Sequence, residues 1–78
     1  MTELIQKVKK GRNVYAVEMY PTWFGYVVRI KAKNGYHYLA KRYNGNYSFC
    51  EDFTYAKGYS WKTAKAIVKD LIERIKEL

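Results

Sequence analysis

Short runs of β-branched and aromatic residues, separated by polar turn residues, occupy the middle of the chain and predict β-strands. Three such runs are residues 13–20 (NVYAVEMY), 24–33 (FGYVVRIKAK) and 36–43 (YHYLAKRY). Pro21 follows the first run, and because proline cannot donate to a sheet ladder, we expect the first strand to stop there. Residues 46–53 (NYSFCEDF) have a similar composition and are expected to form a fourth strand or an extended loop.

Asn-Gly dipeptides separate the later runs. Asn34-Gly35 is the strongest short-range hairpin signal in the chain, because a type I′ turn needs positive φ at both central residues. If these two residues form the turn, Lys33 faces Tyr36 and the register of the whole hairpin follows. A second dipeptide, Asn44-Gly45, predicts another turn before residues 46–53.

The end of the chain changes to a helical period. Residues 61–78 (WKTAKAIVKDLIERIKEL) contain neither Gly nor Pro, and Ser60 is a suitable N-cap in front of them. Helical spacing places six apolar residues on one face: Ala64, Ile67, Val68, Leu71, Ile75 and Leu78. We therefore expect an amphipathic helix that packs on the sheet.

The beginning of the chain is ambiguous. Leu4, Ile5 and Val8 have helical spacing and Thr2 could cap them, so residues 1–12 predict a short helix or a basic arm. The predicted fold is a single small α+β domain over residues 1–78. It consists of an antiparallel sheet of three to four strands within residues 13–57 and a helix over residues 60–78.

The charge of the chain indicates which class of partner it binds. The 78 residues carry 15 Lys and Arg against seven Asp and Glu, a formal net charge of +8. Nine of the basic residues but only two of the acidic ones lie in residues 1–45, so the positive field belongs to the N-terminal segment and the first strands. A strongly basic surface attracts phosphate or an acidic protein. The 14 aromatic residues, nine of them Tyr, are too many for a disordered basic tail.

Several site classes are excluded by the residues present. Cys50 is the single cysteine and His37 the single histidine, so a disulfide or a four-ligand zinc site is not expected. The chain has no Gly-rich phosphate loop and no nucleophile elbow. We expect no metal, no cofactor and no enzymatic activity. No apolar run approaches the ~20 residues of a membrane span, and residues 1–11 lack a signal peptide, so we expect a cytoplasmic protein without a membrane partner.

The predicted hairpin has two different faces. One collects mainly apolar residues and is expected to lie under the helix: Tyr26, Val28, Ile30, Ala32, His37, Leu39, Lys41 and Tyr43. The other gathers four cations around two tyrosines: Val27, Arg29, Lys31, Lys33, Tyr36, Tyr38, Ala40 and Arg42. Lys and Arg neutralise phosphates, while Tyr can stack on a base.

These features define the candidate nucleic-acid-binding residues. They are Arg29, Lys31, Lys33, Tyr36, Tyr38 and Arg42 of the hairpin and Lys9, Lys10 and Arg12 of the basic arm. Arg29 and Arg42 could read a guanine edge if the strands enter a major groove. The alternative is that these side chains only keep the sheet soluble. Trp23 and Phe24 are either a hydrophobic wedge or a cover for the end of the sheet.

Two segments carry a resemblance to known families. Trp23 to Gly35 (WFGYVVRIKAKNG) and Gly58 to Val68 (GYSWKTAKAIV) resemble the DNA-binding domains of phage and transposon integrases and of plant ethylene-response factors. The resemblance implies a three-stranded sheet that enters the major groove through Arg29, Lys31, Lys33, Tyr38 and Arg42. Residues 44–57 would be an insertion in that pattern.

The predicted function is that of a small, non-enzymatic nucleic-acid-binding protein. Duplex DNA is favoured over RNA as its partner. The alternative is a phage-type inhibitor or accessory factor that holds an acidic protein, because Tyr, Trp and Arg are also the residues of protein hot spots. A homodimer is compatible with the small core, since pairing through a strand edge or the helix would enlarge it.

Overall fold

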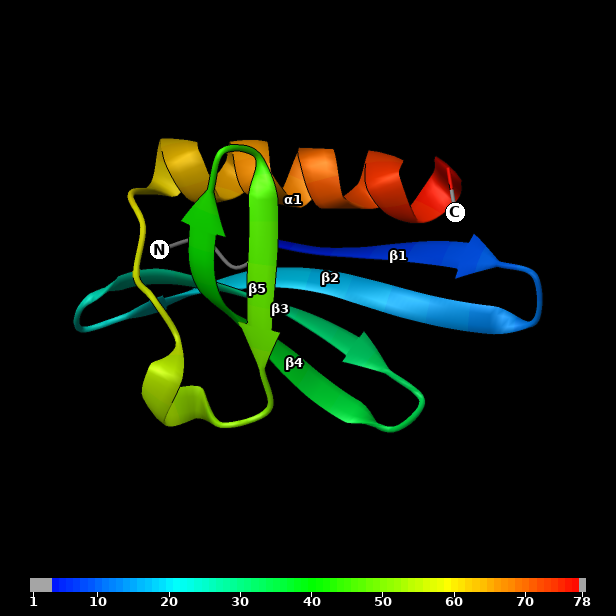
Figure 1. Ribbon diagram of the computed structural model, residues 1–78, viewed down its shortest axis with the longest axis horizontal. Helices are drawn as coiled ribbons and strands as arrows, with labels where there is room; N and C mark the ends of the chain where they lie inside the picture. Colours follow the sequence, from blue (N-terminus) through cyan, green and yellow to red (C-terminus); the bar gives the residue numbers. More distant parts are fainter. Residues whose placement is uncertain (1–3, 78) are drawn as a thin grey trace.

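Five β-strands follow one another along the chain and one α-helix ends it in the computed structural model, which describes residues 4–77 (Figure 1). The elements are β1 (Leu4–Lys10), β2 (Asn13–Thr22), β3 (Gly25–Ala32), β4 (Gly35–Tyr43), β5 (Asn46–Cys50), the 3-10 helix η1 (Phe53–Tyr55) and α1 (Trp61–Glu77). The α+β fold is confirmed, but the sheet has five strands and not three or four.

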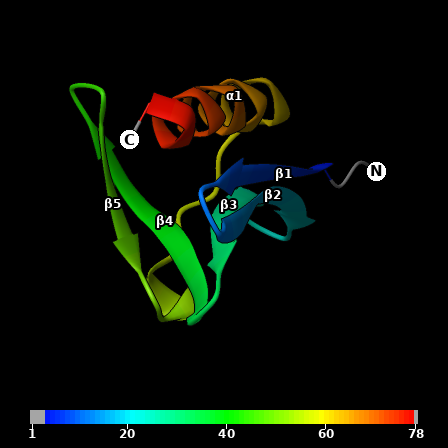
Figure 2. The same ribbon diagram turned by 90° about the vertical axis from the view of Figure 1, so that its right-hand side faces the viewer.

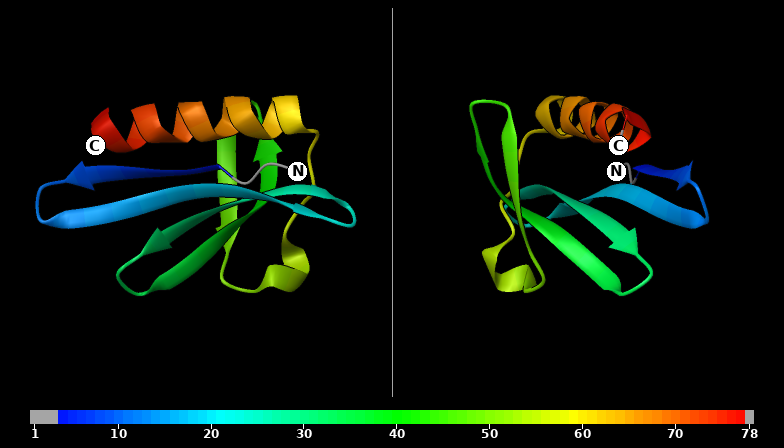
Figure 3. Two further views of the ribbon diagram at one scale, coloured as in Figure 1. Left: turned by 180° about the vertical axis from the view of Figure 1, so that it is seen from behind. Right: turned by 45° about the vertical axis from the view of Figure 1, so that its right-hand side comes forward.

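The sheet is an antiparallel meander in the order β1-β2-β3-β4-β5, so each strand pairs with its neighbour in sequence. Helix α1 contacts β1, β2 and β3 and covers one face of the sheet only (Figure 3). The β4–β5 hairpin turns away from the first three strands and its tip reaches the level of α1 (Figure 2). The sheet therefore has one face against α1 and a second face that α1 does not reach, where the short 3-10 helix η1 packs against β4.

Residues 4–10 form a strand, so the prediction of a short helix or a basic arm is wrong. β1 pairs with β2 over its whole length, from Leu4 opposite Met19 to Lys10 opposite Asn13. This ladder satisfies the backbone of a segment too short to hold a stable helix alone. Val8 is buried while Ile5 is half exposed, as expected for opposite sides of a strand. The proposed cap, Thr2, lies outside the described residues.

Strand β2 continues through Pro21 to Thr22, beyond the predicted end. The reason lies in its partner, Tyr26. The N–H and C=O of Tyr26 bond the C=O and N–H of Tyr59, both at 2.8 Å, and so point away from β2. Pro21 and Tyr26 are therefore a pair without hydrogen bonds between β2 and β3. The missing N–H of Pro21 breaks no hydrogen bond with β3.

The β3–β4 hairpin forms where predicted but with a shifted register. Ala32 faces Gly35, so the two turn residues are Lys33 and Asn34, and the predicted pairing of Lys33 with Tyr36 is wrong. Only Gly35 supplies a positive φ, 124°, in this turn. The shift is two residues, and because side chains alternate with a period of two, the faces stay as predicted. The type I′ conformation appears instead in the next hairpin, at Asn44 (φ 50°) and Gly45 (φ 78°).

A β-bulge in β4 changes which residues face the helix. The register shifts between Leu39, which pairs with Phe49, and Lys41. Past the bulge Arg42 pairs with Tyr47, whose ring packs on the core and whose hydroxyl bonds Asp70 of α1. Because the bulge adds one residue to β4, each side chain after it points to the opposite face from the one that simple alternation predicts. Arg42 therefore lies on the helix side, whereas the predicted core positions Lys41 and Tyr43 are exposed.

The core forms between α1 and the sheet, as the helical period predicted. Five of the six predicted residues of the helix are buried there, Ala64, Ile67, Val68, Leu71 and Ile75, and the sixth, Leu78, lies outside the described residues. They pack against Val8, Val17, Met19, Val28 and Leu39 of the sheet. Ser60 is the N-cap, since its Oγ accepts a hydrogen bond from the backbone N–H of Thr63 at 3.3 Å.

Candidate nucleic-acid interface

The sheet face opposite α1, called the helix-free face below, is built by the residues that alternate with core residues along the strands. Cross-strand pairing sets them in rows. One row runs from Ile5 through Glu18 and Arg29 to Tyr38, and the next from Lys7 through Ala16 and Lys31 to Tyr36. The face thus carries both charges and tyrosines.

Arg29 occupies the centre of this face and is already paired. Its Nε donates to Oε1 of Glu18 at 2.7 Å, and Glu18 is only 7% exposed. The guanidinium also lies 4.5 Å from the ring centre of Tyr20 and 4.1 Å from that of Tyr36. Burial acts to lower the pKa of Arg29, but the hydrogen bond and charge of Glu18 keep that pKa above its ordinary value. Arg29 therefore organises the tyrosines around it, and its charge is neutralised in place.

Four exposed lysines surround the small side chains of Val14 and Ala16 beside this pair. This lysine band consists of Lys7, Lys9, Lys31 and Lys33. Three of them line a shallow depression of about 220 Å³ over Val14 and Ala16. The ion pairs within residues 4–77 are Arg29–Glu18 and Arg74–Asp70, so neither uses a lysine of the band. A cluster of this kind raises the local concentration of anions.

A continuous row of aromatic rings crosses the rest of the helix-free face. Its members, the aromatic row, are Trp23, Phe24, Phe53, Tyr38 and Tyr36. Successive ring centres are 5.2, 6.1, 5.5 and 6.3 Å apart, within the usual range for interacting rings. At its end, Nζ of Lys31 lies 5.6 Å from the ring centre of Tyr36. The aromatic row therefore leads directly into the lysine band.

The structure divides the nine predicted site residues between two sides. Six lie on or beside the helix-free face: Arg29, Lys31, Lys33, Tyr36, Tyr38 and Lys9. Lys10 instead donates from Nζ to the backbone oxygen of Lys76, at 3.1 Å, near the end of α1. Arg12 lies in the β1–β2 turn, and Arg42 faces the helix side. Arg29 and Arg42 are therefore not brought together.

Three residues of the face were not among the predicted set. Lys7 belongs to the same basic cluster as Lys9, Lys10 and Arg12 but is not one of the nine predicted site residues; strand alternation places Lys7 and Lys9 on one face. Tyr20 was assigned to a strand, but its place beside Arg29 depends on the β2–β3 register. Phe53 reaches Tyr38 and Phe24 through tertiary packing alone, and no sequence pattern indicates that contact.

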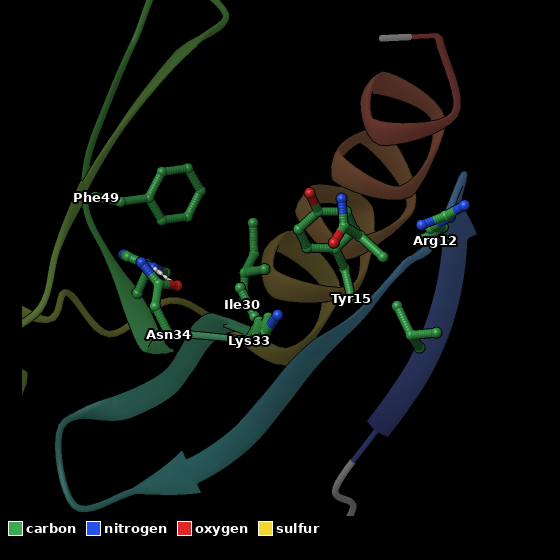
Figure 4. Close-up of a pocket in the computed structure, with 10 residues that line it drawn as sticks. Arg12, Tyr15, Ile30, Lys33, Asn34 and Phe49 are labelled. Atoms are coloured by element: carbon green, nitrogen blue, oxygen red, sulfur yellow. Dashed lines mark hydrogen bonds between the residues drawn. The ribbon is translucent and has the colours of Figure 1, made fainter.

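A groove opens on the helix side, where the sheet extends beyond α1 (Figure 4). It has a volume of about 650 Å³, an apolar floor of Tyr15, Ile30 and Phe49, and the cations Arg12 and Lys33 among its lining residues. His37, the single histidine, also lines it and shares a long hydrogen bond of 3.4 Å with Asn34. The groove is suited to an apolar group that carries negative charge.

A hydrogen bond joins the β4–β5 hairpin to the helix. The hydroxyl of Tyr47 donates to Oδ2 of Asp70 at 2.6 Å, and Nε of Arg74 donates to the same oxygen at 3.1 Å. The hydrogen bond from Tyr47 is the main cause that holds the pKa of Asp70 below its ordinary value of 3.8. Burial opposes this shift and the charge of Arg74 supports it. The carboxylate form of Asp70 thus stabilises the contact between β5 and α1.

Replacement of Tyr47 by Phe is expected to raise the pKa of Asp70 towards 3.8. A lowered carboxyl pKa contributes stability above the ordinary value and loses it as the pH falls through the lowered value. The variant should therefore lose stability relative to the wild type at neutral pH, and the difference should shrink in acid. Carboxyl NMR titration of Asp70 measures the shift. Tyr43→Phe, at an exposed tyrosine, is the control, and an unchanged pKa in Tyr47→Phe would contradict the assignment.

Metal and membrane features are absent from the described part of the chain. Residues 4–77 contain no group of three or more His, Cys, Asp or Glu side chains that could bind a metal ion. Within the same residues no helix is both long enough and apolar enough to cross a bilayer. Cys50 is a free, half-buried thiol.

The integrase and ethylene-response-factor resemblance stays a prediction. Comparison with known proteins found that no family model matches the chain, and neither a curated protein nor a solved structure matches it.

Proposed function

We propose that this protein binds nucleic acid through the helix-free face. The observation that carries the proposal is the lysine band, in which four exposed lysines from two strands and a turn converge on the small residues Val14 and Ala16. Glu18, the nearest carboxylate along the rows, is engaged by Arg29 and does not neutralise the band. Lysines in this arrangement neutralise backbone phosphates and release their counterions.

The aromatic row supports nucleic acid over a simple inorganic anion. Tyrosine hydroxyls can bond phosphates, and exposed rings can stack on bases. Duplex DNA, the form favoured by the sequence, needs only the phosphate contacts. The geometry gives no support to joint reading of a guanine edge by Arg29 and Arg42, because these residues lie on opposite sides of the sheet.

A salt series tests the proposal. If the four lysines each neutralise one phosphate, the logarithm of the binding constant should fall with the logarithm of the salt concentration. The slope should be about −3.6 for duplex DNA and about −2.8 for a single strand. Fluorescence anisotropy of labelled oligonucleotides measures it. No binding of any nucleic acid at ~50 mM salt, or a slope near zero, would contradict the proposal.

The second candidate function is capture of an acidic segment of a partner protein in the groove. The supporting observation is the combination of an apolar floor with Arg12 and Lys33 in the lining. This combination matches an apolar side chain flanked by carboxylates. It becomes the leading candidate if every nucleic acid fails to bind at ~50 mM salt.

A further inference from the structure

The end of the aromatic row farthest from the lysine band is its most exposed part, although Phe24, next to that end, is half-buried. Tyr36 and Tyr38 are half-buried, Phe53 is 42% exposed, and Trp23 at the tip of the β2–β3 hairpin is 95% exposed. Trp23 thus neither covers the core nor closes the end of the sheet. An exposed tryptophan at the end of a continuous row of rings suits a planar, aromatic ligand group.

The backbone that carries Trp23 is held firmly. The Thr22 hydroxyl donates to the carbonyl oxygen of Gly25 at 2.5 Å and accepts from the N–H of Phe24 at 3.3 Å. The paired hydrogen bonds between Tyr26 and Tyr59 fix the base of the hairpin. The turn also packs so closely on Gly58 that a side chain there would overlap the Phe24 carbonyl. A fixed backbone with a free ring is preorganised for stacking.

The helix-free face is long enough for several nucleotides. Six residue steps of β2 separate Ala16, within the lysine band, from Thr22, next to Trp23. At about 3.4 Å per residue this is about 20 Å. At ~3.4 Å per stacked nucleotide the same length corresponds to at most about six nucleotides, and to fewer where a base stacks on a protein ring and not on its neighbour. This number is within the range of ~4–16 nucleotides that a single-strand-binding domain covers.

We infer that the ligand of the helix-free face is single-stranded nucleic acid, with bases stacked on the aromatic row and phosphates on the lysine band. This inference rests on the proposed function and names its substrate. In a duplex the bases are already stacked and paired, so the exposed rings of Trp23 and Phe53 would have no base faces to contact. A single strand presents both chemical groups of the site to the same face.

The test compares four labelled probes at one salt concentration. They are a 12-nucleotide oligothymidine, the corresponding oligouridine, an abasic 12-mer with the same phosphates, and a 12-base-pair duplex. Oligothymidine or oligouridine should bind at least about tenfold more tightly than the abasic strand, because stacked bases add affinity. Oligothymidine or oligouridine should also bind more tightly than the duplex. The ratio of the oligothymidine affinity to the oligouridine affinity distinguishes DNA from RNA as the source of the single strand.

Trp23→Ala should weaken oligothymidine binding about tenfold while leaving abasic-strand binding and the salt slope unchanged. Trp61→Phe is the matched control at the other tryptophan, which lies at the start of α1. In this control protein Trp23 is the single tryptophan, so its fluorescence should be quenched by oligothymidine and not by the duplex.

The outcomes separate this inference from the proposed function. Equal affinity for duplex and single strand, with no effect of Trp23→Ala, would overturn the inference and leave nucleic-acid binding in place. Abasic binding as tight as oligothymidine binding would also overturn it, since phosphates alone would then account for the affinity. Failure of all four probes at ~50 mM salt would instead reject the proposed function.

Discussion

Replacement of both Lys7 and Lys31 by Glu is expected to weaken nucleic-acid binding about 100-fold at ~50 mM salt. The two residues flank Ala16 in one row of the sheet and are the centre of the lysine band. Each lost phosphate contact removes about 0.9 from the salt slope for a duplex and about 0.7 for a single strand. At ~50 mM salt such a contribution is worth roughly a tenfold change in affinity, so the loss of two contacts weakens binding about 100-fold. Anisotropy titrations of the double variant across a salt series measure both the affinity and the slope.

The matched control is replacement of Lys62 and Lys69 by Glu on the outer side of α1. Both residues are exposed, and the two double variants have the same net charge. The helix variant should lose only a few-fold in affinity, because its charges lie on the opposite side of the sheet from the bound phosphates and are screened over roughly 10 Å. Equal losses in the two variants would show that net charge, and not the helix-free face, determines binding.

Leu71→Ala is expected to lower the free energy of unfolding by about 2–5 kcal/mol. Leu71 is buried between α1 and the sheet, where its removal leaves a cavity among well-packed side chains. A domain of this size has a total stability of roughly 4–12 kcal/mol, so the loss is a large fraction of the whole. Urea unfolding followed by far-ultraviolet circular dichroism measures the change.

The control for this variant is Ile5→Ala. Ile5 is an aliphatic residue of β1 that is half exposed on the helix-free face, so its truncation should cost less than about 1 kcal/mol. If the two substitutions destabilised the protein equally, α1 would not pack on the sheet as described. The lysine variants should keep the wild-type unfolding transition, because their substituted side chains are exposed.

The elements with a clear local pattern were predicted correctly from the sequence. The helix has a strict apolar period and a capping serine, and both were confirmed. The predicted assignment of side chains to the two faces of the β3–β4 hairpin was also correct as far as Leu39. A register error of two residues leaves the alternation of side chains unchanged. The candidate lysines Lys31 and Lys33 could thus be placed on one face by pattern alone, whereas Lys9 reaches them only through the β1–β2 pairing.

The remaining features depend on contacts that no local pattern encodes. The bulge in β4 is a property of the β4–β5 pairing, and it moved Arg42 to the helix side. The pairing of Arg29 with Glu18 depends on the β2–β3 register, which is set by a Trp23–Phe24 turn without an Asn-Gly signal. Residues 4–10 had a spacing compatible with either helix or strand, and the neighbouring strand decided between them.

The helix that completes the core leaves the ribosome after all five strands. The strands β1 to β3 can pair once Ala32 has left the ribosome, because each of them pairs with a sequence neighbour. Residues 33–77 must still emerge before α1 can dock, and at about 5–20 residues per second this takes roughly 2–9 s. Throughout that interval the side chains of Val17, Met19 and Val28 lack their cover. The nascent chain therefore passes through a state with an open apolar sheet, on which a chaperone can act before folding is complete.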